Sequence, residues 1–368
     1  MKKLAIIGAS VGQLPICLKA KEMGIETHGF AWAKDAVCKD VVDYFHPISI
    51  LEKDAIVEAC RELHIDGVVT NASELTAEVA AYVSERLGLN GTPYRILEQL
   101  HNKFLVRQLS EKVEALSKPR FYKYDGTDHG IYPCVVKPCG GSAKVGVSFV
   151  SDKEELAKAI TYAQGTTDGD IVVEEYIDGK ELSVESISFR GQHHIIQITD
   201  KDSSSAPHFV ELGHHQPAII GPAIRKKIED AIPQLLQTIG YTDGASHIEV
   251  KFTGEELYLI EVNLRGGGDE ISNRLVQMSS GVDYLRCMIE VALGTFEKPV
   301  RTSERSFAGI YYLCKQTESY LPFFKRAKGK AWLVECSVFN EKLKESHSNY
   351  ERDGFLIYRS DHKITPDE

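Results

Sequence analysis

The first ninety residues alternate between short apolar runs and amphipathic segments, and this alternation limits the folds that the chain can adopt. Apolar runs cover residues 4–10, 25–32 and 67–73, and segments with helical spacing cover residues 13–24, 51–65 and 74–88. Strands that alternate with helices of this length form βαβ units and a parallel sheet. We therefore predict an α/β domain over residues 1–92.

Ligands of such a sheet bind at the carboxyl ends of its strands. These ends are expected at residues 8–10, 32–33 and 70–74, so Glu74 is a candidate substrate-binding residue. An acid at this position would also favour the start of a helix through the helix dipole, and both interpretations stay open. Gly8 and Gly12 lack the middle glycine of a GxGxxG motif, which favours a structural turn over a dinucleotide site.

Beyond residue 92 the pattern changes to short β-like runs interrupted by glycines, which is typical of an α+β arrangement. We expect one helix over residues 95–114, a polar loop over residues 201–205 and a proline-bounded helix over residues 221–240. These features divide the remaining chain into a domain over residues 93–299 and a β-rich segment over residues 300–368. The strands of the last segment either complete the preceding sheet or pack on the first domain.

Composition excludes some partners. The net charge is −10 and there is no long basic tract, which argues against nucleic acid as a partner. No stretch of about 18 apolar residues exists, so no membrane span is expected. The eight cysteines are scattered and form no CxxC pair, which is typical of reduced thiols in a cytoplasmic protein.

A hairpin near the two-thirds point of the chain collects polar side chains on one face. We expect strands over residues 245–252 and 257–265 around a loop at residues 254–256, with Thr253 opposite Leu257. Glu249 then lies opposite Glu261, and His247 lies opposite Asn263. The alternation directs His247, Glu249, Lys251, Glu261, Asn263 and Arg265 to one face, and Ile248, Val250, Phe252, Ile260, Val262 and Leu264 to the core.

Two carboxylates that face each other across a strand pair repel and destabilise the hairpin. A solvated face balanced by Lys251 would reduce the repulsion in part. A divalent cation would reduce it further, because paired carboxylates and an amide oxygen suit Mg²⁺. We therefore predict that Glu249, Glu261 and Asn263 bind Mg²⁺.

Two further segments are candidates for nucleotide binding. In residues 134–150 a strand that ends at Lys137 enters a glycine-rich turn, whose backbone N–H groups could approach phosphates, although a plain turn is an equal alternative. In residues 171–185 an apolar run ends at Glu174, followed by Tyr176, Ile177 and Glu181. These groups could bind a purine and a ribose, or form an ordinary hairpin tip.

Taken in order, these segments resemble the ATP-grasp superfamily over residues 8–294. The resemblance rests on Lys103 in a helix, then VVKPCGGSAKVGV, VVEEYIDGKELSVE, HIEVKF and LIEVNLRGGG. The E-x-N-x-R pattern in the last of these is the most specific single motif. The run GGGDEISNRLVQMSSGVDYLRCMIEVALG is similar to the branch that contains L-amino-acid ligases and other carboxylate–amine ligases.

The resemblance implies a Rossmann-like (pre-ATP-grasp) domain before an ATP-grasp domain, with a mobile lid over residues 119–177. It also implies residue roles. The phosphate contacts would be Lys103, Lys137 and the loop residues Gly140, Gly141, Ser142 and Lys144, and the adenine and ribose contacts would be Glu174, Tyr176, Ile177 and Glu181. The metal ligands would be Glu249, Glu261 and Asn263. The catalytic residues would be Arg265, Gly267 and His214 or His215, and the substrate contacts would be Glu74, Arg265 and Gly266.

Two positions depart from the family pattern. Asn102 stands where an acid usually precedes the helix lysine, and the loop reads CGGSAKVGV in place of a serine-rich form, so Lys144 either contacts phosphate or points to solvent.

The implied activity is an ATP-dependent ligase that joins a small carboxylate substrate to an amine through an acylphosphate. The alternatives are a carboxylase or phosphoryl-transfer enzyme of the biotin carboxylase and purine-pathway type, and a non-catalytic nucleotide-binding module. The expected cofactors are ATP and Mg²⁺, with Mn²⁺ as the alternative ion. The sequence leaves the oligomeric state open, with a homodimer as one alternative.

Overall fold

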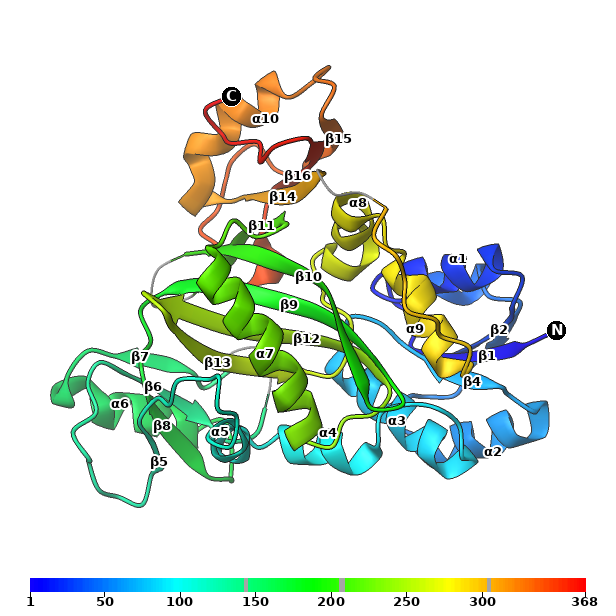
Figure 1. Ribbon diagram of the computed structural model, residues 1–368, viewed down its shortest axis with the longest axis horizontal. Coiled ribbons are helices and arrows are strands. Elements are labelled where there is room, and N and C mark those ends of the chain that lie inside the picture. The colour runs from blue at the N-terminus through cyan, green and yellow to red at the C-terminus, as the bar shows by residue number, and fades with distance from the viewer. Residues whose placement is uncertain (142–144, 205–208, 303–305) are drawn as a thin grey trace.

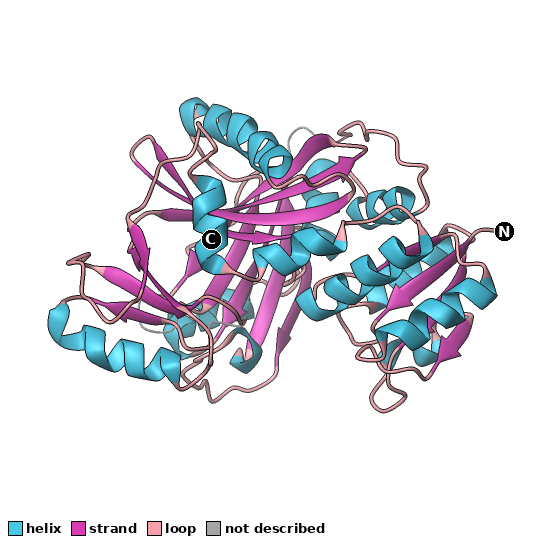
Figure 2. Cartoon of the chain, turned by 90° about the horizontal axis from the view of Figure 1, so that it is seen from below, coloured by secondary structure: helices cyan, strands magenta, loops and turns pink. Residues whose placement is uncertain are grey.

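A computed structural model describes residues 1–141, 145–204, 209–302 and 306–368 (Figure 1). Two predicted phosphate contacts, Ser142 and Lys144, lie outside these described residues. The described strands form three sheets, of four, eight and four strands. The N-terminal sheet and the eight-stranded sheet lie side by side, and the third sheet stands at the opposite end of the large one (Figures 1 and 2).

The N-terminal sheet is parallel, as predicted, with the strand order β3-β2-β1-β4. Figure 2 shows helices on both sides of its strands. The short strand β3 was not predicted. Ser73 caps α3 by accepting the Thr76 N–H, so Glu74 is the first residue of that helix. The elements are β1 (Lys3–Ile7), α1 (Leu14–Glu22), β2 (Glu26–Phe30), η1 (Val37–Asp40), β3 (Tyr44–His46), α2 (Lys53–Leu63), β4 (Gly67–Val69) and α3 (Glu74–Leu87).

The single helix expected over residues 95–114 is two helices, α4 (Tyr94–Leu100) and α5 (Lys103–Ser110). The break occurs because Asn102 has an extended backbone and accepts the Leu105 N–H, which makes it the N-cap of a new helix. Asn102, which departs from the family pattern, therefore positions Lys103 at the start of α5.

The predicted lid segment forms an antiparallel sheet with the order β5-β8-β6-β7, and α6 packs against it. This unit has its own apolar core, centred on Val136, Ile160 and Val173. Its movement as a lid stays a prediction. The elements are β5 (Phe121–Lys123), β6 (Cys134–Pro138), β7 (Ser148–Val150), α6 (Lys153–Gln164) and β8 (Ile171–Glu175).

The eight-stranded sheet is antiparallel, with the order β13-β12-β9-β10-β11-β14-β16-β15. The C-terminal strands therefore complete this sheet, which is the first of the two alternatives left open by the sequence. Helix α7 covers one face and buries Ile228, Ile232 and Leu236 against it. The strands are β9 (Lys180–Phe189), β10 (Gln192–Ser203), β11 (Glu211–Gln216), β12 (Gly244–Thr253), β13 (Glu256–Asn263), β14 (Phe307–Leu313), β15 (Leu333–Val338) and β16 (Gly354–Ser360).

The expected polar loop at residues 201–205 is wrong for its first three residues, because β10 continues to Ser203. Lys201 pairs with Glu181 of β9 and with His214 of β11, so the strand has hydrogen-bonded neighbours on both sides. The proline-bounded helix expected over residues 221–240 is α7 (Pro222–Thr238).

A helical connection links the large sheet to the N-terminal domain. Helix α9 packs against both β4 and α1, and Lys19 lies 2.8 Å from Asp283 across this contact. Apolar residues of both regions share one core, which includes Leu4, Leu275 and Ile289. The remaining helical elements are η2 (Ile271–Leu275), α8 (Val276–Ser280), α9 (Tyr284–Ala292), η3 (Lys315–Tyr320), α10 (Leu321–Arg326) and η4 (Asn349–Glu351).

The eight cysteines are free thiols, as expected, and only Cys336 is not buried. Within the described ranges, none of the helices combines the length and the apolar character needed to cross a membrane.

Candidate active site

The β12–β13 hairpin opposes two carboxylates, as the sequence predicts. Glu249 pairs with Glu261, and His247 pairs with Asn263. The turn differs from the prediction, because Thr253 pairs with Glu256 and leaves only two residues, Gly254 and Glu255, in the loop.

A β-bulge reconciles this shorter turn with the predicted pairing. The register shifts by one residue between the Glu249–Glu261 and Val250–Leu259 pairs, so Ile260 is the extra residue of β13. Leu259 and Val262 are therefore both buried in the core, while Ile260 is only partly buried. The predicted core position of Ile260 is wrong, because the alternation breaks at the bulge.

The two opposed carboxylates have different electrostatic environments. Burial opposes ionisation of Glu249, but the charges of Lys201 and His247 outweigh it and hold the Glu249 pKa below its ordinary value. Desolvation, together with the charges of Glu249 and Glu74, raises the pKa of Glu261. The Glu261 side chain nevertheless retains exposed surface. The charge on Glu261 is thus the one that a bound cation would relieve.

Lys201 is a buried ammonium at the centre of three carboxylates. Its Nζ lies 2.5 Å from Glu249, 2.9 Å from Glu211 and 3.0 Å from Glu181. Burial alone would lower the Lys201 pKa, but these acids hold it well above its ordinary value. Glu181, the predicted ribose contact, therefore has one carboxylate oxygen bound to Lys201 and the other 3.6 Å from Lys251.

A second buried ion network joins α5 to the lid sheet. Arg107 donates to both carboxylate oxygens of Glu174, at 2.6 and 3.1 Å, and Lys137 contacts the same carboxylate. Burial opposes ionisation, yet the charges of Arg107 and Lys137 lower the Glu174 pKa to about 2. The Glu174 carboxylate thus contacts two cations, and its expected contact with adenine stays a prediction.

Arg107 also connects this network to the β12–β13 hairpin. It donates to the Leu259 carbonyl at 2.8 Å and to the Ile260 carbonyl at 3.1 Å. The bulge that sets the Glu249–Glu261 register therefore exposes backbone carbonyls to a buried guanidinium. Lys137, the predicted phosphate contact, lies beside this guanidinium, and burial together with the Arg107 charge lowers the Lys137 pKa against the opposing effect of Glu174.

The glycine loop after β6 lies next to the start of α5. Lys103 donates from its backbone N–H to the Cys139 carbonyl at 2.8 Å and from Nζ to the Gly141 carbonyl at 2.6 Å. Both Gly140 and Gly141 face open space where a side chain would be. These predicted phosphate contacts therefore lie next to one another.

The segment after β8 offers backbone groups beside aromatic rings. The Tyr176 N–H donates to the Pro133 carbonyl at 3.0 Å, so the Tyr176 backbone has only its carbonyl to offer a base. Its ring packs edge-on against Phe149, and the Lys251 ammonium lies 5.4 Å from the ring centroid. Ile177 follows directly, and the expected adenine contacts of this segment stay a prediction.

Arg265 brings the hairpin to the N-terminal domain. Its guanidinium lies 3.9 Å from the Glu74 carboxylate and donates to the Gly266 carbonyl at 3.0 Å. Within the described part of the chain, its buried Nε has no hydrogen-bond partner. The predicted substrate contacts Glu74, Arg265 and Gly266 therefore meet where the two domains join.

The glycines after Arg265 allow a close approach of backbone to buried polar groups. A Cβ atom on Gly266 would lie 2.5 Å from the Asn71 Oδ1 atom. A Cβ atom on Gly267 would lie 2.7 Å from the His247 Nδ1 atom, which itself lies 2.6 Å from the Glu185 carboxylate. Only glycine fits at Gly267 without displacing this buried histidine–carboxylate pair.

Of the two candidate histidines, His214 belongs to the cleft. It pairs with Lys201 across β10 and β11, and its Nε2 atom lies 3.3 Å from Glu211 and 3.6 Å from Asp269. Burial opposes protonation, but the two acids raise the His214 pKa. His215 lies on the other face of β11, between Asp202 and the Tyr358 hydroxyl.

Glu211, His214 and Asp269 offer ligand atoms within 4.8 Å of one another, which is close enough to hold a metal ion. Both acids already have buried or half-buried cationic partners, because Lys201 binds Glu211 and Arg352 donates to both Asp269 oxygens at 2.6 and 2.9 Å. We therefore describe this group as an ion-pair network, which Lys201 connects to Glu249 of the β12–β13 hairpin.

Comparison with known proteins identifies the domain that contains most of these residues. Residues 131–273 match the family model described as "ATP-grasp domain". The chain carries an ATP-grasp domain. This match confirms the predicted superfamily, and the matched residues include both opposed glutamates and His214.

Relatives outside the family model agree with this ATP-grasp assignment. The chain is 25% identical over 311 residues to alanine–anticapsin ligase of Bacillus subtilis (strain 168), covering 73% of this chain and 65% of that protein. It is 27% identical over 172 residues to pyruvate carboxylase of Staphylococcus aureus (strain Mu50 / ATCC 700699), covering 44% of this chain and 14% of that protein. The chain thus spans less than two thirds of the length of these curated relatives.

A solved structure supports the fold. The L-amino acid ligase from Bacillus licheniformis superimposes with a TM-score of 0.81 at 23% identity, over 98% of this chain and 94% of that chain. This likeness supports the predicted fold class, in which a parallel-sheet region precedes a largely antiparallel one. Two of the three relatives are named as ligases, which agrees with the predicted enzyme class.

The sequence does not predict four residues of the ion-pair networks around the candidate site: Arg107, Lys201, Asp269 and Arg352. Lys201 was read as part of a loop, although its apolar upstream run could have been extended into a longer strand. Arg107 and Arg352 pair with acids 67 and 83 positions away, and no local pattern marks such partners.

Proposed function

We propose that this protein is an ATP-dependent ligase that joins a small carboxylate substrate to an amine. In the first step a carboxylate oxygen attacks the γ-phosphorus of ATP, the bond to ADP breaks, and an acylphosphate forms. In the second step the amine attacks the acyl carbon, the carbon–oxygen bond breaks, and phosphate leaves. The observation that carries the proposal is the pair of opposed carboxylates, Glu249 and Glu261, beside the two lysines Lys103 and Lys137.

Phosphoryl transfer of this kind depends on positioning and on charge stabilisation more than on covalent help from the protein. The residues around the hairpin suit that demand. Glu249, Glu261 and Asn263 would hold Mg²⁺, which when bound would neutralise charge on the phosphates. The fit is supported by Glu261, which pairs with Glu249 across the hairpin and, within the described residues, has no ion-pair partner of its own; besides desolvation, the charges of Glu249 and Glu74 contribute to its raised pKa. Mn²⁺ offers the same charge and accepts the same oxygen ligands.

The lysines and the glycine loop would bind the phosphate end of the nucleotide. Lys103 and Gly141 are in direct contact, and Gly140 faces open space, so backbone N–H groups could approach phosphate oxygens closely. Lys137 would supply a charge from the strand that precedes the loop. Its attachment to Glu174 and Arg107 would hold the ammonium in place before the nucleotide arrives.

Arg265 would stabilise the transferred phosphoryl group and later the tetrahedral oxyanion, because its buried Nε atom has an unused donor within the described structure. Glu74 faces this guanidinium from the N-terminal domain and would bind the ammonium of an amino-acid-type substrate. His214 and its two acids border the same region, where they would orient the second substrate.

Measurement of ADP formation tests the proposal. Purified protein should form ADP with ATP, Mg²⁺ and amino-acid mixtures, and Glu261→Gln should abolish that activity while the protein stays folded. The matched control is Glu255→Gln, at the exposed turn of the same hairpin, which should keep full activity. Retained activity in Glu261→Gln would contradict the metal assignment.

A carboxylase is the second candidate, and the similarity to a pyruvate carboxylase favours it. The two functions differ in the co-substrate that stimulates ADP formation. An amine requirement without a bicarbonate requirement supports the ligase, and the reverse supports the carboxylase. If a wide panel of carboxylates, amines and bicarbonate gives no ADP, the protein is a nucleotide-binding module.

A further inference from the structure

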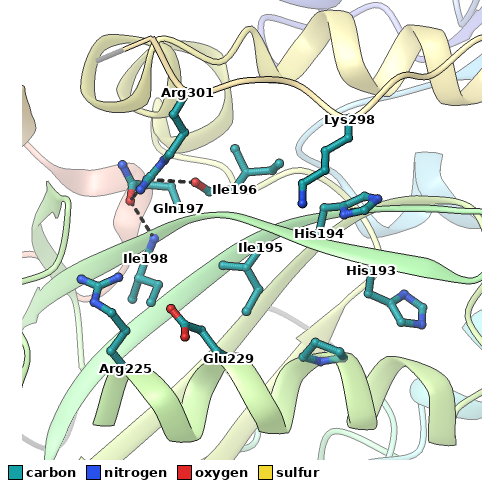
Figure 3. A pocket seen from close by; sticks show the side chains of 11 residues that line it. His193, His194, Ile195, Ile196, Gln197, Ile198, Arg225, Glu229, Lys298 and Arg301 are labelled. Carbon is teal, nitrogen blue, oxygen red and sulfur yellow. Dashed lines mark hydrogen bonds between the residues drawn. The ribbon is translucent and has the colours of Figure 1, made fainter. Parts of the chain in front are cut away.

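A pocket of about 330 Å³ lies along β10, away from the hairpin and the glycine loop. Figure 3 shows the elements that line it. The first half of β10 crosses the middle of the view, α7 lies below it, and the segment after α9 lies above it. Within the described residues β11 pairs with β10 only from Asp200 onward, and the carbonyls of Ile196 and Ile198 accept hydrogen bonds from Arg301 and from the Ala218 N–H instead.

Cationic groups from separate elements converge on this pocket. Arg225 comes from the first turn of α7, and Lys298 and Arg301 come from the segment after α9, while Glu229 is the one acid among the lining residues. Within the described residues, none of these four side chains takes part in an ion pair. The pocket therefore carries an excess of positive charge that the described part of the protein does not balance.

The like charges around this pocket repel one another. Partial burial and the charge of Arg225 lower the pKa of Arg301, and partial burial and the charge of Lys298 lower the pKa of His194. Like charges that approach each other in a concave site destabilise the protein unless an anion joins them.

Arg301 is held in place by the protein itself. It donates to the Ile196 carbonyl at 3.1 Å and to the Gln197 side chain at 2.9 Å (Figure 3). Gln197 in turn donates to Ser279 at 2.7 Å, and Ser279 donates to Gln216 at 3.0 Å. A guanidinium fixed in this way loses little conformational freedom when it binds a ligand, which favours affinity.

We propose that this pocket is a second ligand site, which binds a small polyvalent oxyanion of the phosphate-ester or polycarboxylate class. Two guanidinium groups and an ammonium match the geometry and charge of such an anion. The volume accommodates a small molecule and excludes a macromolecule. Gln216 lies two residues after His214 on β11, so the hydrogen-bond chain from Arg301 connects the occupied pocket to a strand of the candidate active site.

Equilibrium dialysis with inorganic phosphate and with citrate tests the site at constant ionic strength. Saturating ADP and Mg²⁺ are present so that phosphate positions of a nucleotide site are filled. One saturable site is expected for at least one of the two anions, and Arg225→Gln should weaken its binding at least tenfold. Arg301→Gln should act in the same direction. Circular dichroism establishes that each variant is folded.

Two controls separate this pocket from other sources of binding. Lys226→Gln removes an exposed charge next to Arg225 that pairs with Asp230, and it should leave the affinity unchanged. Lys103→Ala removes a candidate phosphate contact of the nucleotide site and should also leave it unchanged. The proposal is overturned if neither anion binds saturably, if binding survives both arginine substitutions, or if Lys103→Ala abolishes it.

Discussion

Replacement of Lys201 by methionine tests the electrostatic core of the candidate site. Lys201→Met keeps most of the apolar stem but removes the ammonium that three carboxylates approach at 2.5, 2.9 and 3.0 Å. At an effective dielectric constant of about 20, each contact is worth roughly 5–7 kcal/mol before desolvation. The variant no longer has to desolvate an ammonium, and this gain offsets much of the lost attraction to the three carboxylates. Removal of one member of a buried ion pair typically costs about 3–5 kcal/mol of stability. We expect the free energy of unfolding to fall by about that amount.

The loss should depend on pH. In the wild-type protein the lowered pKa of Glu249 contributes stability above the unfolded pKa of about 4.3, and this contribution disappears as the pH falls through the folded value. Without Lys201 the buried carboxylates repel one another and their folded pKa rises, so protonation stabilises the variant at acidic pH. The difference between the two proteins should therefore be smaller at pH 5 than at pH 7.5.

Urea unfolding followed by circular dichroism and by tryptophan fluorescence measures both effects. Lys226→Met is the matched control, because Lys226 is an exposed lysine paired with one acid on α7, and no measurable loss is expected. The reasoning is refuted if Lys201→Met costs less than about 1 kcal/mol, a value typical of exposed ion pairs. It is equally refuted if the cost is the same at both pH values.

Three further predictions concern the same candidate site. Gly267→Ala should lower kcat for ADP formation at least tenfold, because the new Cβ would lie 2.7 Å from the His247 Nδ1 atom; an unchanged kcat would refute the close-approach argument. Glu74→Gln should raise KM for the amino-acid substrate and leave KM for ATP unchanged, as measured in the same assay, whereas a change in KM for ATP alone would contradict the substrate role. Burial opposes protonation of His247, but Glu185 raises the His247 pKa to about 9. The protonated His247 therefore contributes its full share to the free energy of unfolding below the unfolded pKa of about 6.5, and this contribution is lost as the pH rises through 9. Urea unfolding between pH 6 and pH 10 should show this loss in the wild-type protein and a weaker one in Glu185→Gln, and parallel curves would refute it.

Local patterns predicted most of the fold. The alternation of apolar and amphipathic segments identified the parallel sheet because each βαβ unit is contiguous in sequence. The facing of Glu249 and Glu261 was predictable because polar residues at every second position must share a face. The bulge at Ile260 was not predictable from that rule, since an extra residue leaves the pattern on either side of it intact.

The errors arose where distant residues decide local structure. Asn102 ends α4 by capping α5, and a capping residue inside an amphipathic run is easily read as part of one helix. Lys201 was assigned to a loop because the burial of a lysine depends on three acids from β9, β11 and β12, which no local window contains.

The order of strands in the large sheet has a consequence for synthesis of the protein on the ribosome. β16 lies between β14 and β15, although β15 precedes it in the chain. Arg352, which donates to both carboxylate oxygens of Asp269, comes just before β16. A nascent chain that has emerged only as far as β15 can neither dock that strand nor restrain Asp269. The Arg352–Asp269 contact therefore forms late in translation, and premature termination before residue 352 should yield a chain in which Asp269 and its neighbour His214 are not held in this arrangement.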